Sequence, residues 1–307
     1  MKQNALTFVI KLLFFNVVVF AIIFFCIMPQ YSTEYNAAMI DKVDVLEDID
    51  APKIIIVGGS SVAFGIDSIE MQEALDMPVI NVGLHAGLGS SFHSDVIKDY
   101  IAEGDIVVIA PESYDSVSTA GDIVLTWLTI ENHFKLWGGV NDFQYYDMFK
   151  SYPTYLKRIM NLWVAGEGNR VIDDNAYARS AFNGNGDNVF PRPILKFEAS
   201  DIKFASSELS DAMELYWNEY NAFVQSKNAR LFMSSPPIMD NDVTVNLNLL
   251  EKELDEKLDF PRISNFNDYI YPQSYFFDNP HHLNDVGKKI RTEQLISDIK
   301  RQLSTEG

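Results

Sequence analysis

The longest apolar segment of the chain lies at its N-terminus. Residues 6–28 are almost entirely apolar and are interrupted only by Thr7, Lys11 and Asn16. A segment of this length is about long enough to cross a bilayer as a helix. Bulky residues occupy the positions at which a signal peptide would need small ones for cleavage. We therefore expect an uncleaved membrane anchor over residues 1–29.

Charges on the two sides of this segment predict its orientation. Lys2 and Lys11 precede or enter the span, whereas acidic residues are frequent between residues 41 and 50. The positive-inside rule then places the N-terminus in the cytoplasm and the rest of the chain outside it. Residues 30–52 are polar and acidic without a clear period, which predicts a tether. A domain is expected from residue 53 to residue 307.

Short apolar runs alternate with helical patterns at the start of this domain. Residues 54–57 are four β-branched residues without polar alternation, as is typical of a strand buried on both faces of a parallel sheet. Further apolar runs cover residues 79–82 and 106–110, and Asp67-Ser-Ile-Glu70 resembles a helix capping box. This βαβαβ order predicts a parallel sheet with right-handed crossovers.

The alternation stops between about residues 112 and 205, where aromatic-rich and glycine-rich pieces predict an insertion above the sheet. Such an insertion commonly builds a lid or a substrate wall, and it can equally form an interface for a partner chain. Its aromatic side chains can stack on sugar rings, although core packing is the more common role of such residues. They are Trp127, Trp137, Tyr145, Tyr146, Tyr152, Tyr155 and Trp163.

The alternation of strands and helices returns after the insertion, and we expect about five parallel strands in a three-layer αβα domain. The expected elements are a helix around residues 209–224, a strand at 230–234, a helix at 243–258, a short fifth strand at 262–266 and a final amphipathic helix capped by Asn284.

Composition excludes several functions. The 43 acidic residues outnumber the 24 basic ones, and the formal net charge of -19 disfavours a nucleic-acid partner. The only cysteine, Cys26, lies in the apolar segment, so an intramolecular disulfide is impossible. Gly58 and Gly59 do not belong to a Gly-x-Gly-x-x-Gly or Gly-Lys-Ser/Thr phosphate loop, and we discount nucleotide binding.

Two serines follow the first strand, where its carboxyl end opens onto the ligand-binding edge of an α/β sheet. On this stretch alone, Ser60 and Ser61 are better explained as helix-capping hydroxyls. A loop before the last helix reverses the preference, because Asp278, His281 and His282 supply a base and a carboxylate to orient it, as acyl transfer by serine requires. These three residues leave a metal ligand set incomplete, and we expect no metal and no cofactor.

Five motifs in this order support a family assignment, each weak alone and fairly specific as a set. They are Gly58-Gly-Ser-Ser-Val-Ala-Phe-Gly-Ile-Asp67, Asn81-Val-Gly-Leu-His-Ala-Gly-Leu-Gly89, Gly104-Asp-Ile-Val-Val-Ile-Ala-Pro-Glu112, Arg179-Ser-Ala-Phe-Asn183 and His282-Leu-Asn-Asp-Val-Gly287. Together they resemble membrane-anchored bacterial members of the SGNH, or GDSL-type, hydrolase superfamily. The resemblance spans most of the domain and implies a flavodoxin-like fold.

The resemblance also implies a catalytic triad. Ser60 matches the family nucleophile, with Ser61 as the alternative, and His282 matches the family histidine because of the residues that follow it. Asp278 would orient this histidine from four residues upstream. The usual spacing in the superfamily is three residues, a spacing that His281 satisfies.

An oxyanion hole is implied as well. The backbone amides of Ser60 and Gly83 match two of its donors, each of which is typically worth about 3 kcal/mol of transition-state stabilisation. The family's third block normally provides an Asn, whereas this chain has Glu112 after the third strand. Asn183, in the insertion, is the candidate replacement.

The resulting functional hypothesis is a serine esterase or acyltransferase acting on O-acyl groups, such as O-acetyl, of a surface or extracytoplasmic glycan. The alternative is a non-catalytic glycan-binding or scaffold subunit of a polysaccharide assembly or modification system. The altered third block and the aromatic insertion motivate this alternative. The sequence does not specify an oligomeric state.

Overall fold

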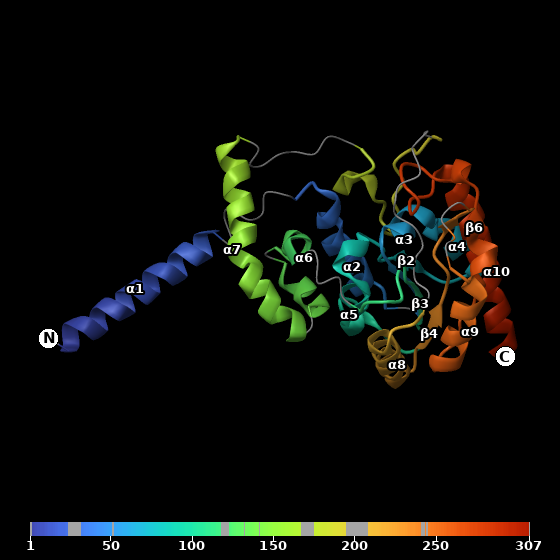
Figure 1. The fold of residues 1–307 in the computed structure, drawn as a ribbon, viewed down its shortest axis with the longest axis horizontal. Coiled ribbons are helices and arrows are strands. Elements are labelled where there is room, and N and C mark those ends of the chain that lie inside the picture. The colour runs from blue at the N-terminus through green and yellow to red at the C-terminus, as the bar shows by residue number, and fades with distance from the viewer. Residues whose placement is uncertain are drawn as a thin grey trace.

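A four-stranded parallel sheet forms the centre of the domain (Figure 1). The strand order is β2-β1-β3-β4, so the α/β class and the parallel sheet expected from the sequence are confirmed. The strands are β1 (Ile54–Gly58), β2 (Val79–Asn81), β3 (Ile106–Ala110) and β4 (Arg230–Met233). The computed structural model describes residues 2–23, 32–50, 52–117, 123–131, 133–140, 142–166, 175–194, 208–240, 243 and 245–306.

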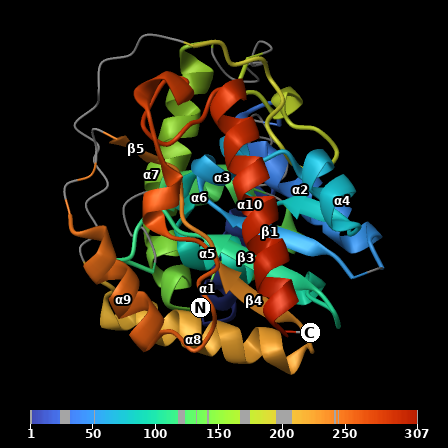
Figure 2. The same cartoon turned by 90° about the vertical axis from the view of Figure 1, so that its right-hand side faces the viewer.

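The uninterrupted apolar run of β1 fills two cores, one on each face of the sheet. Ile54 and Ile56 pack in one core together with Leu295 of α10 (Asp285–Glu306), which crosses this face of the sheet (Figure 2). Ile55 and Val57 point to the opposite core. Successive side chains of a strand alternate between faces, so only a strand covered on both sides needs every residue to be apolar.

The expected fifth strand is not part of this sheet. Arg262 forms only an isolated parallel bridge with Met233 at the sheet edge. Beyond this bridge, the Ser264 hydroxyl accepts the Ser235 amide at 2.6 Å. Two shorter strands, β5 (Ile238–Met239) and β6 (Ile270–Tyr271), form a separate parallel pair.

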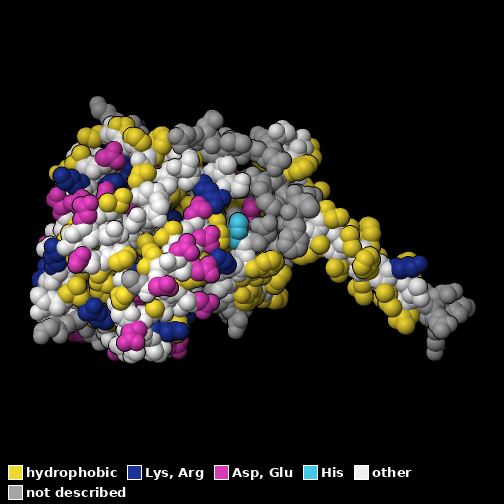
Figure 3. All heavy atoms as spheres, turned by 180° about the vertical axis from the view of Figure 1, so that it is seen from behind, with side chains coloured by type: hydrophobic (Ala, Val, Ile, Leu, Met, Phe, Trp, Pro, Cys, Tyr) yellow, Lys and Arg dark blue, Asp and Glu magenta, His cyan; other side chains and the backbone are white. Residues whose placement is uncertain are grey.

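The N-terminal helix α1 (Lys2–Ile22) stands away from the domain (Figure 1), and Figure 3 shows it as an almost continuous apolar surface. Residues Ala5–Ile22 form a helical segment long and apolar enough to span a membrane. The remainder of the expected anchor, residues 24–29 with Cys26, lies outside the described residues.

Most of the expected tether has a different structure. Residues 38–48 form α2 (Ala38–Asp48), which packs on the domain. Met39, Val43 and Leu46 are buried on one face of this helix. Their spacing of three to four residues is typical of an amphipathic helix. The acidic residues on the other face give the segment a polar composition, which by itself does not indicate a helix.

The described part of the insertion is mainly helical, and α6 (Ile123–Ile130) packs against α7 (Asp142–Val164). Trp127 and Tyr155 are buried with ring centroids 6.1 Å apart, so these two aromatic residues belong to the core. Tyr146 and Trp163 are 73% and 49% exposed. Contact with sugar therefore remains a prediction for the exposed residues alone.

Two caps confirm sequence predictions. The Asp67 side chain accepts the Glu70 amide at 3.2 Å at the start of α4, and the Asn284 side chain accepts the Gly287 amide at 3.0 Å at the start of α10. The other described α-helices are α3 (Ser60–Gly65), α4 (Ser68–Leu75), α5 (Ser90–Asp95), α8 (Asp211–Ser226) and α9 (Leu247–Lys257).

Candidate functional site

A glycine turn joins the carboxyl end of β1 to the first residue of α3. A Cβ atom on Gly58 would lie 2.5 Å from Val62 Cγ2, and one on Gly59 would lie 2.5 Å from Glu112 Oε1. The turn therefore needs glycine at both positions because other chain segments approach the backbone closely. It presents Ser60 at the edge of the sheet. Ser60 is partly exposed, whereas Ser61 is fully buried, so Ser60 is the more accessible hydroxyl.

The C-terminal loop brings Asp278 to His282 rather than to His281. His282 Nδ1 lies 3.0 Å from Asp278 Oδ1, and Asn279 Nδ2 lies 2.7 Å from the same nitrogen. The orientation of the Asn279 amide is fixed because its Oδ1 accepts the backbone amides of both histidines. The His282 ring stacks on Phe64 of α3 with centroids 4.1 Å apart, which places it beside the helix that begins at Ser60.

Tyr177, from the insertion, completes this cluster and was not identified from the sequence. Its hydroxyl donates to Asp278 Oδ2 at 2.5 Å and lies 3.0 Å from His282 Nδ1. Burial of Tyr177, assisted by the nearby Asp278, raises the pKa of this hydroxyl, so it remains a donor. Because 101 residues separate Tyr177 from Asp278, no local sequence signal links them.

The Asp278 carboxylate is held in its charged form. Its partial burial would raise its pKa, but hydrogen bonds from His282 and Tyr177 outweigh this effect, and the pKa lies below its usual value. At neutral pH, Asp278 can therefore accept a hydrogen bond from His282 Nδ1 in the tautomer that carries the ring proton there, whereas the Asn279 amide can donate to Nδ1 only in the other tautomer. The bond to Asp278 would leave Nε2 of the neutral ring free to accept a proton.

Within the described residues, no hydrogen bond joins Ser60 to His282. Both residues nevertheless lie on α3 or directly against it, because Phe64 stacks on the imidazole. Hydrogen bonds between a nucleophile and its base are often long in ligand-free structures and shorten when substrate binds. The arrangement thus brings together Asp278 and His282, and it places Ser60 on the helix whose Phe64 contacts the imidazole.

Two of the three groups expected to form the oxyanion hole, the Gly83 amide and the Asn183 side chain, have other partners. The Gly83 amide donates to Asn81 Oδ1 at 2.8 Å, although Gly83 itself packs against Val62 and Ala63 of α3. Asn183 Oδ1 accepts the backbone amide of Asp187 at 2.9 Å and so stabilises the turn at residues 183–187. The structure does not bring the Asn183 side chain into contact with Ser60.

Glu112 lies beside the glycine turn that precedes Ser60. Its Oε1 accepts the Ser61 amide at 2.8 Å. Burial would raise the pKa of Glu112, but the nearby His281 and the hydrogen bonding of Ser61 outweigh it, and the net shift is below the usual value. Glu112 is therefore charged at neutral pH. The sequence motif does not predict this charge beside the turn.

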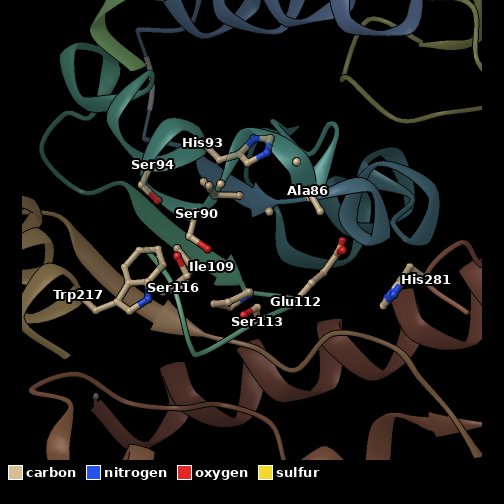
Figure 4. Close-up of a pocket in the computed structure, with 16 residues that line it drawn as sticks. Ala86, Ser90, His93, Ser94, Ile109, Glu112, Ser113, Ser116, Trp217 and His281 are labelled. Atoms are coloured by element: carbon tan, nitrogen blue, oxygen red, sulfur yellow. The ribbon is translucent and has the colours of Figure 1, made fainter. Parts of the chain in front are cut away.

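A cavity of about 310 Å³ opens beside this turn (Figure 4). His281 lies at one end, with Glu112 nearer to it than to Trp217 of α8, which lies at the opposite end; Gly59 also lines the cavity. His93 of α5 forms part of the wall. The volume is at the lower end of the range of small-molecule sites, roughly 300–1,000 Å³. The cavity thus lies beside the turn that leads to Ser60, although neither Ser60 nor His282 is among the described residues that line it.

The described residues contain no group of three or more His, Cys, Asp or Glu side chains that could hold a metal ion. The chemistry available at the site is that of a hydroxyl, an imidazole and a carboxylate. Comparison of the chain with known protein families, curated proteins and solved structures finds no match.

Proposed function

We propose that this chain is a membrane-anchored serine esterase or acyltransferase of the SGNH type. Its substrate would be an O-acyl group, such as O-acetyl, on an extracytoplasmic glycan. The observation that carries the proposal is the Asp278–His282 pair, 3.0 Å apart, beside the helix that begins at Ser60. The proposed topology has α1 in the membrane, the N-terminus in the cytoplasm and the domain outside.

In the proposed reaction, Ser60 Oγ attacks the ester carbonyl carbon while His282 Nε2 takes the hydroxyl proton. The tetrahedral intermediate collapses, the bond to the alcohol oxygen breaks, and His282 returns the proton to the leaving alcohol. Water or a second alcohol then attacks the acyl-enzyme, with His282 again acting as the base. Asp278 holds the imidazole in the required tautomer, and Tyr177 holds Asp278.

The test is hydrolysis of p-nitrophenyl acetate by the full chain in detergent. Ser60→Ala and His282→Gln should each lower kcat by roughly 10³-fold or more, because the triad acts as a unit. Ser61→Ala is the matched control and should retain activity, since Ser61 is buried. Equal turnover by Ser60→Ala and the parent protein would refute the assignment of the nucleophile.

A specific observation favours the non-catalytic scaffold as the second candidate. The Ser61 amide donates to the charged Glu112, and the Gly83 amide donates to Asn81, so two donors near Ser60 are already engaged. A carboxylate in this position also opposes the negative charge that develops on an oxyanion. Glycan binding by a parent protein that neither turns over esters nor reacts with a fluorophosphonate would support this candidate.

A further inference from the structure

The helix α7 has two apolar faces, and only one of them packs on the domain. The inner face carries Met148, Tyr155 and Ile159, which are buried in the core. The outer face has apolar residues at alternating spacings of four and three, so that they form one row along the helix. This row, the outer stripe, consists of Phe149, Pro153, Leu156, Met160 and Trp163.

The outer stripe is exposed over most of its length. Phe149, Met160 and Trp163 are 56%, 57% and 49% exposed, and Leu156 is half-buried. A helix on the surface of a soluble protein normally has polar residues on its outer face. Single exposed apolar side chains are common, whereas a contiguous row of them marks contact with another protein or with a membrane. The outer stripe is therefore a contact surface.

The position of α1 identifies the kind of surface that the stripe meets. Figure 1 shows α7 on the side of the domain from which α1 extends. Phe20 of α1 contacts Tyr152 of α7, with ring centroids 5.5 Å apart. Phe20 lies within the segment that is long and apolar enough to span a membrane. When α1 is in a bilayer, Tyr152 therefore lies at the level of the hydrocarbon edge.

The outer stripe lies beside this contact on the surface of α7. Phe149 is three residues before Tyr152, and Leu156 is four residues after it. Residues three and four apart are neighbours on the surface of a helix. The same bilayer edge that Tyr152 reaches is thus adjacent to the middle of the outer stripe.

Basic residues follow one edge of the outer stripe. Lys150 and Lys157 are exposed and lie seven residues apart, in a row parallel to the stripe. Tyr146 belongs to this basic edge, because Lys150 Nζ lies 6.0 Å from the centre of its ring. Residues 142–164 contain three basic and two acidic residues, although the chain has a net charge of -19. Lysine beside exposed aromatic residues is typical of a helix at the boundary between hydrocarbon and phosphate headgroups.

We propose that α7 is an interfacial helix that lies on the domain side of the membrane crossed by α1. The outer stripe contacts lipid, and Lys150 and Lys157 reach the phosphate headgroups. That α1 crosses the membrane belongs to the proposed function, whereas the contact of α7 with lipid is a separate claim. This second attachment restricts rotation of the domain about α1. It also assigns Trp163 to lipid in place of the sugar contact predicted from the sequence.

The test is fluorescence quenching of the full chain in vesicles of phosphatidylcholine and phosphatidylglycerol that contain lipids with nitroxide-labelled acyl chains. With Cys26→Ser as background, Met160→Cys carries an environment-sensitive fluorophore on the outer stripe. Leu249→Cys is the matched control, because Leu249 is 62% exposed and α9 lies on the opposite side of the domain from α1 (Figure 1). We expect the nitroxide lipids to reduce emission at position 160 about twofold or more and to leave emission at position 249 unchanged.

A probe on α1, at Phe14→Cys, separates this proposal from the proposed function. Quenching at position 14 without quenching at position 160 would overturn the interfacial helix and leave the membrane anchor intact. Absence of quenching at both positions would overturn both claims. Emission at position 160 that is blue-shifted but not quenched would indicate a protein on the outer stripe and would also overturn the proposal.

Two further variants complete the experiment. If Met160→Cys does not fold, Phe149→Cys provides a second position on the outer stripe. Lys150→Glu combined with Lys157→Glu should reduce the quenching at position 160, because glutamate is repelled by the anionic headgroups. Unchanged quenching in this double variant would refute the role of the basic edge.

Discussion

Replacement of Tyr177 by phenylalanine removes a single oxygen atom from the candidate triad. That oxygen donates to Asp278 Oδ2 at 2.5 Å and lies 3.0 Å from His282 Nδ1. The ring itself packs against Tyr35 and Phe64, with centroids 6.0 and 5.7 Å away, so it should remain in place. Tyr177→Phe therefore tests the support of Asp278 without creating a cavity.

The size of the effect follows from the type of hydrogen bond. A hydrogen bond to a charged group contributes about 1.5–3 kcal/mol. The Asp278 side chain is 28% exposed, so water replaces part of the lost bond and the lower limit applies. About 1.5 kcal/mol corresponds to a roughly tenfold reduction of kcat/KM.

The pH dependence has a definite sign. Partial burial tends to raise the pKa of Asp278, whereas His282 and Tyr177 lower it and outweigh burial. Loss of the Tyr177 hydroxyl should therefore raise this pKa. The part of the folding stability that depends on charged Asp278 is present above the pKa of the unfolded state and is lost as the pH falls through the folded pKa. In Tyr177→Phe this part of the stability should accordingly be lost at a higher pH.

The assay is ester hydrolysis by the full chain at neutral pH, with thermal unfolding of the same proteins measured from about pH 2 to about pH 7. Tyr146→Phe is the control, because Tyr146 is 73% exposed. An unchanged kcat/KM and an unchanged pH dependence of unfolding in Tyr177→Phe would refute the positioning role. A loss of activity explained entirely by unfolding would refute it as well.

Three further predictions test other parts of the structure. Burial and the nearby Glu34 raise the pKa of Glu131 from 4.5 to about 8, so the folding stability should fall as the pH rises through this interval. Glu131→Gln should therefore raise Tm more at about pH 8 than at about pH 5. An equal change of Tm at both pH values would contradict this prediction. Gly59→Ala would place its Cβ 2.5 Å from Glu112 Oε1, and it should cost about 1–3 kcal/mol of stability together with most activity, whereas normal Tm and turnover would contradict the close packing. With Cys26→Ser as background, Tyr146→Cys should react with a membrane-impermeant maleimide in intact cells, and labelling only after lysis would contradict the proposed topology.

The parts of the fold that sequence reasoning predicted are those with a local periodic signal. The uniform apolar run of β1 requires burial on both faces, and the structure shows a core on each side. Composition does not predict α2, because this segment is acidic overall. Its helical signal lies in the spacing of Met39, Val43 and Leu46. The predicted strand at residues 262–266 is not confirmed, because backbone pairing there is limited to the isolated bridge between Met233 and Arg262.

The site divides in the same way. Asp278 and His282 lie on one short loop, so their proximity follows from the sequence. The approach of Tyr177 to Asp278 and of Glu112 to Ser61 depends on tertiary packing across 101 and 51 residues, and no pattern in one sequence encodes these contacts. Asn183 was expected at the site, but its side chain accepts the backbone amides of Asn185 and Asp187 within the turn at residues 183–187.

The most direct test of the central claim is the location of a fluorophosphonate adduct by peptide mass spectrometry of the full chain. The account predicts one covalent adduct on the Ser60 side chain, absent in Ser60→Ala and His282→Gln and retained in Ser61→Ala. An adduct on Ser61, or none on a folded parent protein, would contradict the claim that Ser60 is the nucleophile of a working triad.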